Sequence, residues 1–238
     1  MNLTKTYVDG LDELLNGGIP EGSVVLIAGA PGTMKTSLAY SVLYENARHG
    51  SKGLYVSLEQ SRASLLDHVE GLGFPFDAVQ GELSVLDLAA LRKSLAKPAE
   101  QPWLDLFKLY VKGLRSSFGY RFLVIDSLDA LEILAKYQHP RKEFFDLVSW
   151  IRGLGCTAFL LGELASLVTP SGRLGRTALA RHKEEYLVDG ILHVRLARQG
   201  EFGMQRQVRV VKMRGVRHDP DYHALVFDNG FKVTSLMG

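Results

Sequence analysis

Five runs of hydrophobic residues, each of strand length, alternate along the chain with longer helix-like stretches. The runs cover Val24 to Gly29, Gly53 to Leu58, Leu83 to Leu86, Phe122 to Asp126 and Cys156 to Leu161. Because they are nearly continuous rather than alternating, they are typical of parallel strands covered by helices on both faces. The pattern predicts an α/β fold with a mostly parallel sheet.

Two of the intervening stretches have hydrophobic residues at helical spacing. Residues 37–49 and 141–152 each form one apolar stripe, and Gly50 is placed to end the first helix in a left-handed conformation. Another helix is expected from Trp103, whereas residues 93–117 as a whole are the least legible part of the chain.

The pattern changes after residue 188. Residues 190–199, 204–215 and 223–233 have the composition of successive antiparallel strands, and Asn229-Gly230 predicts a hairpin turn. These strands are expected to add an antiparallel region at the C-terminal end of the parallel sheet.

Composition limits the range of functions. The 238 residues, of which 46% are hydrophobic and 23% charged, are expected to form one domain over residues 1–238. A formal charge of +2 gives no strong field that would attract nucleic acid or anionic lipid. The single cysteine, Cys156, and the absence of a signal sequence or a long apolar span favour a cytoplasmic protein without a transmembrane segment.

The stretch GAPGTMKT, residues 29–36, joins the first apolar run to the first helix. It matches the phosphate-binding pattern G-x-x-x-x-G-K-[ST] except that Met34 replaces the second glycine. A left-handed backbone at Met34 would cost on the order of 1 kcal/mol, which packing can offset. We therefore expect a nucleotide site, with hydrolysis less secure than binding. The residues expected to contact the nucleotide are Gly29, Ala30, Pro31, Gly32, Thr33, Met34, Lys35, Thr36 and Ser37.

A magnesium ion is expected beside this loop. Lys35 would reach the β- and γ-phosphates of ATP, and the Thr36 hydroxyl would bind Mg²⁺. Asp126 ends a buried strand in RFLVIDS, where a carboxylate can hold the Mg²⁺ shell, the Walker B role. The alternative for Asp126 is a cap on the following turn.

Glu59 ends another apolar strand, in GLYVSLEQS. If that strand is next to the first one, Glu59 projects beside the phosphate loop and can orient or deprotonate the attacking water. Alone, a strand-end glutamate is more often merely solvated.

These elements together resemble the KaiC-like ATPases of the RecA superfamily. The characteristic part is the opening GLDELLNGGIPEGS before the phosphate loop, and the resemblance continues through EEYLVDGILHVRL at 184–196 and KMRG at 212–215. It implies a RecA-type core, assembly into a ring of usually six subunits, and ATP held between neighbours.

The resemblance also implies roles for individual residues. Glu59 matches the first of the family's two catalytic glutamates, but the second is Gln60 here, which weakens the expectation of a strong ATPase. Lys212 and Arg214 match residues that reach the neighbouring subunit's γ-phosphate, and His218 would border the nucleotide. From the residues alone, Lys212 and Arg214 share one strand face, which is either an anion clamp or a solvated surface.

Two other segments bear on function by the same resemblance. Gly162-Glu163 corresponds to a strand end that could sense the γ-phosphate. Residues 169–183 correspond to the loop facing the channel of the ring and carry several basic residues but no aromatic residue for base stacking. The basic residues are Arg173, Arg176, Arg181, His182 and Lys183. A clock-type phosphorylation cycle is not supported, since no Ser or Thr lies between Ala178 and Asp189.

Three functional hypotheses follow. The favoured one is a slow, Mg²⁺-dependent ATPase with nucleotide sites between the subunits of a ring, acting in signalling or regulation, where a protein partner is one candidate. The second is a nucleotide-gated binding module without turnover, favoured by Met34 and Gln60. The third is a mediator of recombination similar to RadA paralogues, which would bind single-stranded DNA through Arg173, Arg176 and Arg181.

Overall fold

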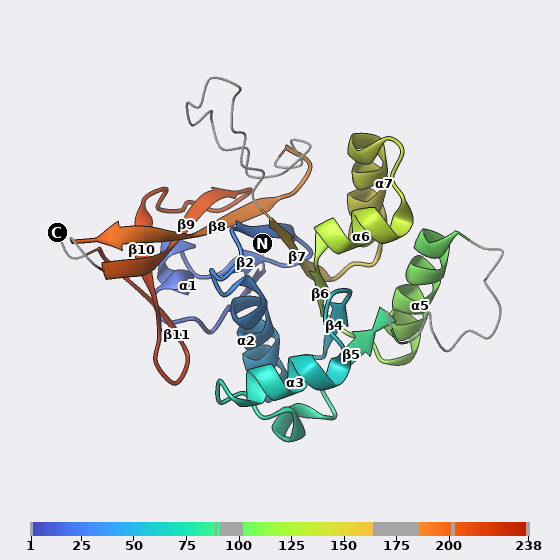
Figure 1. Ribbon diagram of the computed structural model, residues 1–238, viewed down its shortest axis with the longest axis horizontal. Helices are drawn as coiled ribbons and strands as arrows, with labels where there is room; N and C mark the ends of the chain where they lie inside the picture. The colour runs from blue at the N-terminus through green and yellow to red at the C-terminus, as the bar shows by residue number, and fades with distance from the viewer. Residues whose placement is uncertain (1, 89, 91–101, 164–185, 201–202, 237–238) are drawn as a thin grey trace.

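The chain forms a nine-stranded mixed sheet with helices on both faces (Figure 1). The computed structural model describes residues 2–88, 90, 102–163, 186–200 and 203–236. The strands of the main sheet lie in the order β11-β10-β9-β8-β3-β7-β6-β4-β5, and a separate pair, β1-β2, precedes it in the chain. In the described part of the chain no helix is long and apolar enough to span a membrane.

The elements have the following bounds. The strands are β1 (Leu3–Thr4), β2 (Ile19–Pro20), β3 (Val24–Gly29), β4 (Gly53–Ser57), β5 (Leu83–Asp87), β6 (Phe122–Asp126), β7 (Thr157–Glu163), β8 (Gly190–Gln199), β9 (Gly203–Met213), β10 (Tyr222–Phe227) and β11 (Phe231–Thr234). The helices are α1 (Leu11–Leu14), α2 (Lys35–Arg48), α3 (Arg62–Glu70), the 3₁₀ helix η1 (Phe76–Val79), α5 (Trp103–Ser117), α6 (Leu128–Ala135) and α7 (Pro140–Gly153).

The α/β fold class and the antiparallel C-terminal strands are confirmed. Strands β3 to β7 occupy the five apolar runs and are mutually parallel where they pair, and β8 also joins β3 in parallel. Strands β9, β10 and β11 continue the sheet by antiparallel pairing. The predicted hairpin forms between Phe227 and Phe231, where Asn229 and Gly230 both have positive φ.

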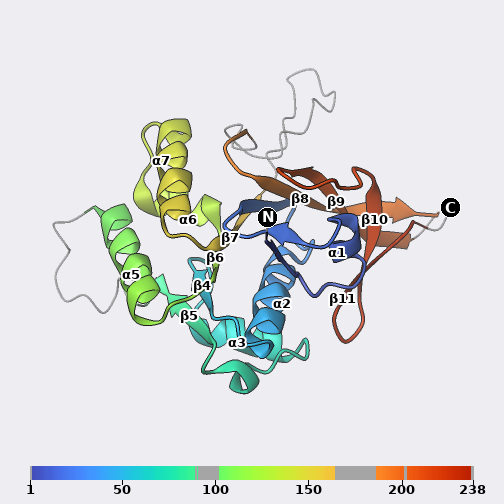
Figure 2. The ribbon, with the colours of Figure 1, turned by 180° about the vertical axis from the view of Figure 1, so that it is seen from behind.

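Each face of the parallel sheet has its own hydrophobic core. Val25 and Ile27 of β3 face the core beneath α2 and α3, whereas Val24 and Leu26 face the core beneath α5, α6 and α7. Strand side chains alternate between faces, so a strand buried on both faces must be apolar at every position, as the sequence of β3 is. Figures 1 and 2 show α2 and α3 close to one another, away from α6 and α7.

The condition attached to Glu59, that its strand lies next to the first one, is not met. Strand β4 is not next to β3, because β7 and β6 lie between them. The connection through α2 therefore crosses two strands before the chain re-enters the sheet, and this spacing brings the carboxyl end of β6 opposite the start of α2. Glu59 cannot reach the phosphate loop as a direct neighbour of β3.

The N-terminal segment is fitted closely against the last strand at Gly10. Gly10 has φ 79°, and a Cβ at this position would lie 2.1 Å from the carbonyl oxygen of Val233. The Val233 N–H donates to the Asp9 carbonyl at 2.7 Å, so the backbone of β11 cannot easily move away.

We expect Gly10→Ala to lower the free energy of unfolding by more than about 2 kcal/mol, because it adds a backbone clash to the strain of a left-handed residue. Gly22→Ala is the matched control: Gly22 has φ 78° but open space around its Cβ position, so about 1 kcal/mol of strain alone is expected. Urea denaturation measures both. Equal losses would contradict the proposed contact.

Candidate functional site

A tight turn after β3 leads directly into α2 and forms the phosphate loop. Gly29 is required for close approach, since a Cβ there would lie 2.4 Å from the Val194 carbonyl oxygen and 2.8 Å from Thr33 Oγ1. Gly32 and Met34 both have positive φ, 79° and 72°. Since α2 begins at Lys35, its first N–H groups have no partner within the helix and are available to an anion.

Met34 adopts the left-handed conformation that the glycine of the pattern would adopt. It is the residue that caps α2, with φ 72° and ψ 31°. The side chain is half-buried and packs against the core beneath α2, which offsets a backbone strain of about 1 to 2 kcal/mol. The loop therefore keeps its geometry with a methionine in this position.

The Lys35 ammonium group is held against the loop. Its Nζ donates to the carbonyl oxygens of Gly29 at 2.8 Å and Ala30 at 3.2 Å. Burial lowers the pKa of Lys35, and four carboxylates oppose this effect. These are Glu163, Asp126, Asp129 and Glu59. One cation thus faces an excess of negative charge, an arrangement that a divalent cation would balance.

Thr36 and Asp126 meet as the magnesium prediction requires. Thr36 Oγ1 donates to Asp126 Oδ2 at 2.8 Å, joining the first turn of α2 to the end of β6. Tyr55, fully buried on β4, donates its hydroxyl to the same oxygen at 2.5 Å. Burial raises the pKa of Asp126, while these two hydrogen bonds act in the opposite direction.

This pair fits Mg²⁺. Magnesium is usually held by one or two carboxylates together with substrate phosphates, and not by a full cage of protein ligands. Accordingly, within the described ranges no three His, Cys, Asp or Glu side chains are grouped closely enough to hold a metal by themselves.

Glu59 is positioned at the site by a residue that follows β6. The chain bends after β4, and Glu59 Oε1 accepts a short hydrogen bond from Ser127, which directly follows Asp126. Ser127 also caps α6, accepting from the Ala130 N–H at 3.3 Å. The Glu59 side chain lies on the same sheet edge as Asp126, although β4 is next to β6 and not next to β3.

Several residues at this edge were not predicted to contribute. Tyr55 and Ser127 bind the two carboxylates directly, and Asp129 accepts the Glu163 N–H at 2.8 Å. Glu163 itself is opposite Gly29 in the β3-β7 register, so the predicted strand end does lie beside the loop. Ser127 and Asp129 could have been found from the run IDSLD, whose polar residues directly follow a strand.

Ser37, the last of the expected loop contacts, has its own partner. Its Oγ lies 3.1 Å from His68 Nε2 on α3, and the residue is buried.

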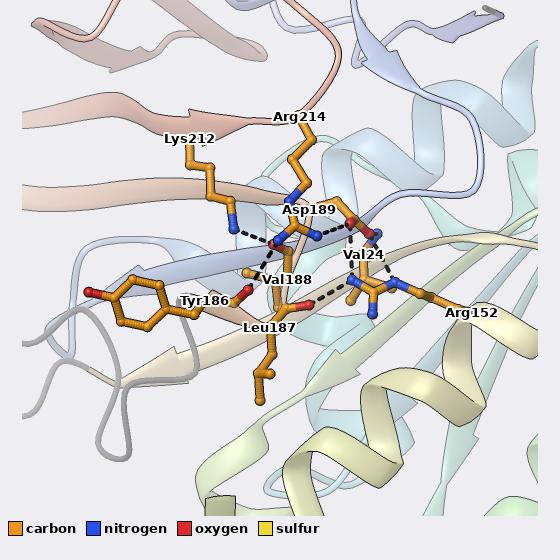
Figure 3. A network of polar contacts seen from close by, with 8 residues as sticks. All are labelled: Val24, Arg152, Tyr186, Leu187, Val188, Asp189, Lys212 and Arg214. Atoms are coloured by element: carbon orange, nitrogen blue, oxygen red, sulfur yellow. Dashed lines mark hydrogen bonds and ion pairs between the residues drawn. The ribbon is translucent and has the colours of Figure 1, made fainter.

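Lys212 and Arg214 lie away from the phosphate loop of their own chain. Lys212 Nζ donates to the Val188 carbonyl oxygen at 2.6 Å, and Arg214 donates to Asp189 Oδ1 at 3.1 Å and to the Tyr186 carbonyl oxygen at 3.2 Å (Figure 3). Asp189 is beside Val24, at the amino end of β3, whereas the phosphate loop follows its carboxyl end.

Asp189 is the centre of a polar network (Figure 3). It accepts from the Val24 N–H at 3.0 Å and from the Arg152 guanidinium at 3.0 Å, in addition to Arg214. Burial would raise the pKa of Asp189, but the hydrogen bonds from Val24 and Arg152 hold it below its ordinary value. Arg214 therefore has a structural partner in its own chain.

Of the two remaining predictions, His218 falls on residues that the structure describes and the basic loop does not. His218 lies in the connection between β9 and β10, where the neighbouring Asp219 N–H donates to the Leu14 carbonyl of α1. Its recorded polar contact is with the Val216 carbonyl, at 3.5 Å, and not with the phosphate loop. The basic loop with Arg173, Arg176, Arg181, His182 and Lys183 lies outside the described residues.

We expect Tyr55→Phe to lower the free energy of unfolding by about 1.5 to 3 kcal/mol, because it removes a buried hydrogen bond to a carboxylate. Tyr40→Phe is the control, since the buried Tyr40 hydroxyl has no hydrogen-bond partner in the described structure. Its removal should be neutral or stabilising in the same urea titration. A loss in Tyr40→Phe equal to that in Tyr55→Phe would contradict this account of Asp126.

Comparisons with known proteins match the chain over almost its whole length. The family model described as "ATPase: KaiC" matches residues 4–236. A UPF0273 protein of Pyrobaculum aerophilum is 31% identical over 95% of this chain and 80% of its own length. A circadian clock oscillator protein KaiC of Picosynechococcus is 27% identical over 98% of this chain, which spans 44% of that relative. The crystal structure of a KaiC-like protein from Pyrococcus horikoshii has a TM-score of 0.78 and 26% identity, covering 98% of each chain.

Proposed function

This chain belongs to the KaiC ATPase family, and we propose that it is a slow, Mg²⁺-dependent ATPase whose nucleotide sites lie between the subunits of a ring. The observation that carries the proposal is the hydrogen bond between Thr36 and Asp126 beside Lys35. It brings a hydroxyl and a carboxylate suited to Mg²⁺ to the helix N-terminus that would bind the phosphates.

The residues of the loop would act on the phosphates by binding and orientation. Backbone N–H groups of residues 32–36 and the Lys35 ammonium would hold the phosphate oxygens, for which Lys35 must leave the Gly29 and Ala30 carbonyls. A bound Mg²⁺ would neutralise charge on the phosphates and polarise the transferred group. Thr36 and Asp126 would hold it.

Glu59 would orient or deprotonate the attacking water. In this structure its carboxylate is occupied by the Ser127 hydroxyl, so this hydrogen bond has to be exchanged for one to water. Gln60 cannot accept a proton in place of a second carboxylate. We attribute slow turnover to these two features.

Lys212 and Arg214 would complete the neighbouring subunit's site. Both side chains are at the end of β3 opposite to their own phosphate loop, which is consistent with action on another subunit. Lys212 would have to exchange the Val188 carbonyl for a phosphate oxygen, and Arg214 would have to leave Asp189. We infer a ring of six from the family, with His218 near the nucleotide of that neighbouring site.

The second candidate is a nucleotide-gated binding module that binds ATP without turnover. The contact between Glu59 and Ser127 favours it, because a glutamate that keeps this partner is not available to water. In that case nucleotide occupancy would control assembly or the docking of a protein partner.

We expect Lys35→Ala to weaken ATP binding by on the order of a hundredfold, because it removes the phosphate-binding cation. Asp126→Asn should selectively abolish the gain in affinity that Mg²⁺ provides. Glu59→Gln should leave ATP affinity unchanged and lower phosphate release by on the order of a hundredfold.

Calorimetric ATP titration and a phosphate-release assay on the same preparations measure these effects. Lys112→Ala, on the exposed surface of α5, is the matched control for loss of one positive charge. Tight ATP binding with release no faster than in Lys35→Ala would select the binding module. No ATP binding by the unmodified chain with Mg²⁺ would refute both candidates.

Mixing two inactive variants tests the role of Lys212 in a neighbouring site. Lys35→Ala impairs its own phosphate loop, whereas Lys212→Ala keeps that loop and removes the cation offered to a neighbour together with its bond to Val188. Mixed assemblies should regain phosphate release, because some interfaces combine an intact loop with an intact Lys212. If Lys212 serves only its own chain through Val188, mixing should restore no activity and Lys212→Ala should instead lower the free energy of unfolding.

A further inference from the structure

A row of polar side chains crosses the antiparallel part of the sheet. His193 on β8 is opposite Arg209 on β9, and Arg209 is opposite Tyr222 on β10. Arg195, two residues after His193, is opposite Gln207. Residues directly opposite one another project from the same face of a sheet, so these five side chains share one face.

This is the face away from α2. Val194 and Val208, which alternate with the polar residues along β8 and β9, belong to the core beneath α2. The helices that cover the other face of the parallel strands, α5, α6 and α7, lie toward the opposite end of the sheet from β9 and β10 (Figures 1 and 2).

Tyr222 is at the centre of the cluster. Its hydroxyl lies 2.7 Å from His193 Nδ1, and the guanidinium carbons of Arg195 and Arg209 lie 3.4 and 5.4 Å from its ring centroid. Arg195 Nε also donates to Gln207 Oε1 at 3.0 Å. The aromatic ring thus holds two cations near one point, against their mutual repulsion.

No acidic side chain balances these charges. In the described ranges neither Arg195 nor Arg209 forms an ion pair: Arg195 contacts the Tyr222 ring and the Gln207 amide, and Arg209 contacts the Tyr222 ring. Burial, followed by the charges of the two arginines, lowers the pKa of His193 to about 4. At physiological pH the ring is neutral, so the cluster carries two positive charges.

Two polar atoms of the cluster are buried without a partner: His193 Nε2 and Arg209 Nε. His193 is 8% exposed, so its ring nitrogen cannot be satisfied by bulk water. If Tyr222 donates to Nδ1, then Nε2 carries the hydrogen and is an unused donor. If Nδ1 donates instead, the Tyr222 hydroxyl hydrogen is unused. The first tautomer leaves a buried donor for an acceptor that the described residues do not provide, whereas in the second the buried Nε2 is an unpaired acceptor and the spare donor is the hydroxyl of the half-buried Tyr222.

We propose that Arg195, Arg209, Tyr222 and His193 form a binding site for a small oxyanion, a phosphate or a carboxylate group. The oxyanion supplies the missing negative charge and accepts from the guanidinium groups, whose planar N–H donors match two oxygens at once. The row begins beside the phosphate loop, because His193 and Val194 pair with Ala28 and Gly29, so its test has to weaken anion binding by that loop.

The test titrates inorganic phosphate into protein carrying Lys35→Ala, which weakens the competing phosphate loop. Binding is measured by calorimetry and by the thermal midpoint at constant ionic strength against chloride. We expect saturable binding that weakens about tenfold or more in Arg209→Gln and in Arg195→Gln. Arg198→Gln is the matched control, since Arg198 is an exposed arginine of β8 that projects from the other face. It should bind phosphate normally.

A spectroscopic readout covers the case in which an arginine variant folds poorly. Phosphate should shift the ring nitrogen resonances of His193 in the Lys35→Ala protein and leave those of the exposed His49 unchanged. Phosphate binding that is equal in all three arginine variants would overturn the proposal. Absence of phosphate binding would also overturn the proposal. If phosphate does not bind and Arg209→Gln lowers the particle mass, the cluster belongs instead to a contact with a second copy of this chain.

Discussion

The hydrogen bond from Thr36 to Asp126 is the contact on which the candidate site depends. It joins the first turn of α2 to the end of β6, two segments that are 90 residues apart in the sequence. Thr36 lies on α2, which packs against the core on one face of the sheet, and Asp126 lies on β6, whose apolar side chains are buried on both faces. The fold itself therefore brings the hydroxyl and the carboxylate together, which would lower the entropy cost of binding a cation between them.

The site also contains groups that reduce stability. Met34 has a left-handed backbone, Lys35 is a buried cation, and Asp126 is a carboxyl group whose pKa is raised by burial. Strain and unfavourable burial are typical of functional positions, because the surrounding fold can maintain what a local sequence would avoid. Met34 and Lys35 at the start of α2 and Asp126 at the end of β6 meet at one place, which is easier to explain by ligand binding than by folding.

The apolar runs predicted the parallel strands well because a strand buried on both faces is apolar throughout, as in β3 and β6. The apolar runs could not predict strand order, since each run can pair with any other apolar strand. The place of Glu59 beside the phosphate loop was therefore conditional on β4 lying next to β3; this condition is not met, and Ser127 after β6 positions Glu59 instead. Tyr55 was missed for the same reason: its hydroxyl has a role only because β6, with Asp126, is the strand next to β4.

The Asp189 network links three parts of the chain that would otherwise move separately. The carboxylate binds the start of β3 through Val24, the end of α7 through Arg152, and the end of β9 through Arg214. An Arg214 side chain that turned toward an adjoining molecule would leave this anion with only Val24 and Arg152. Because the same anion also holds Arg152 of α7, the loss of Arg214 would leave one carboxylate joining the start of β3 to the helix layer on one face of the sheet.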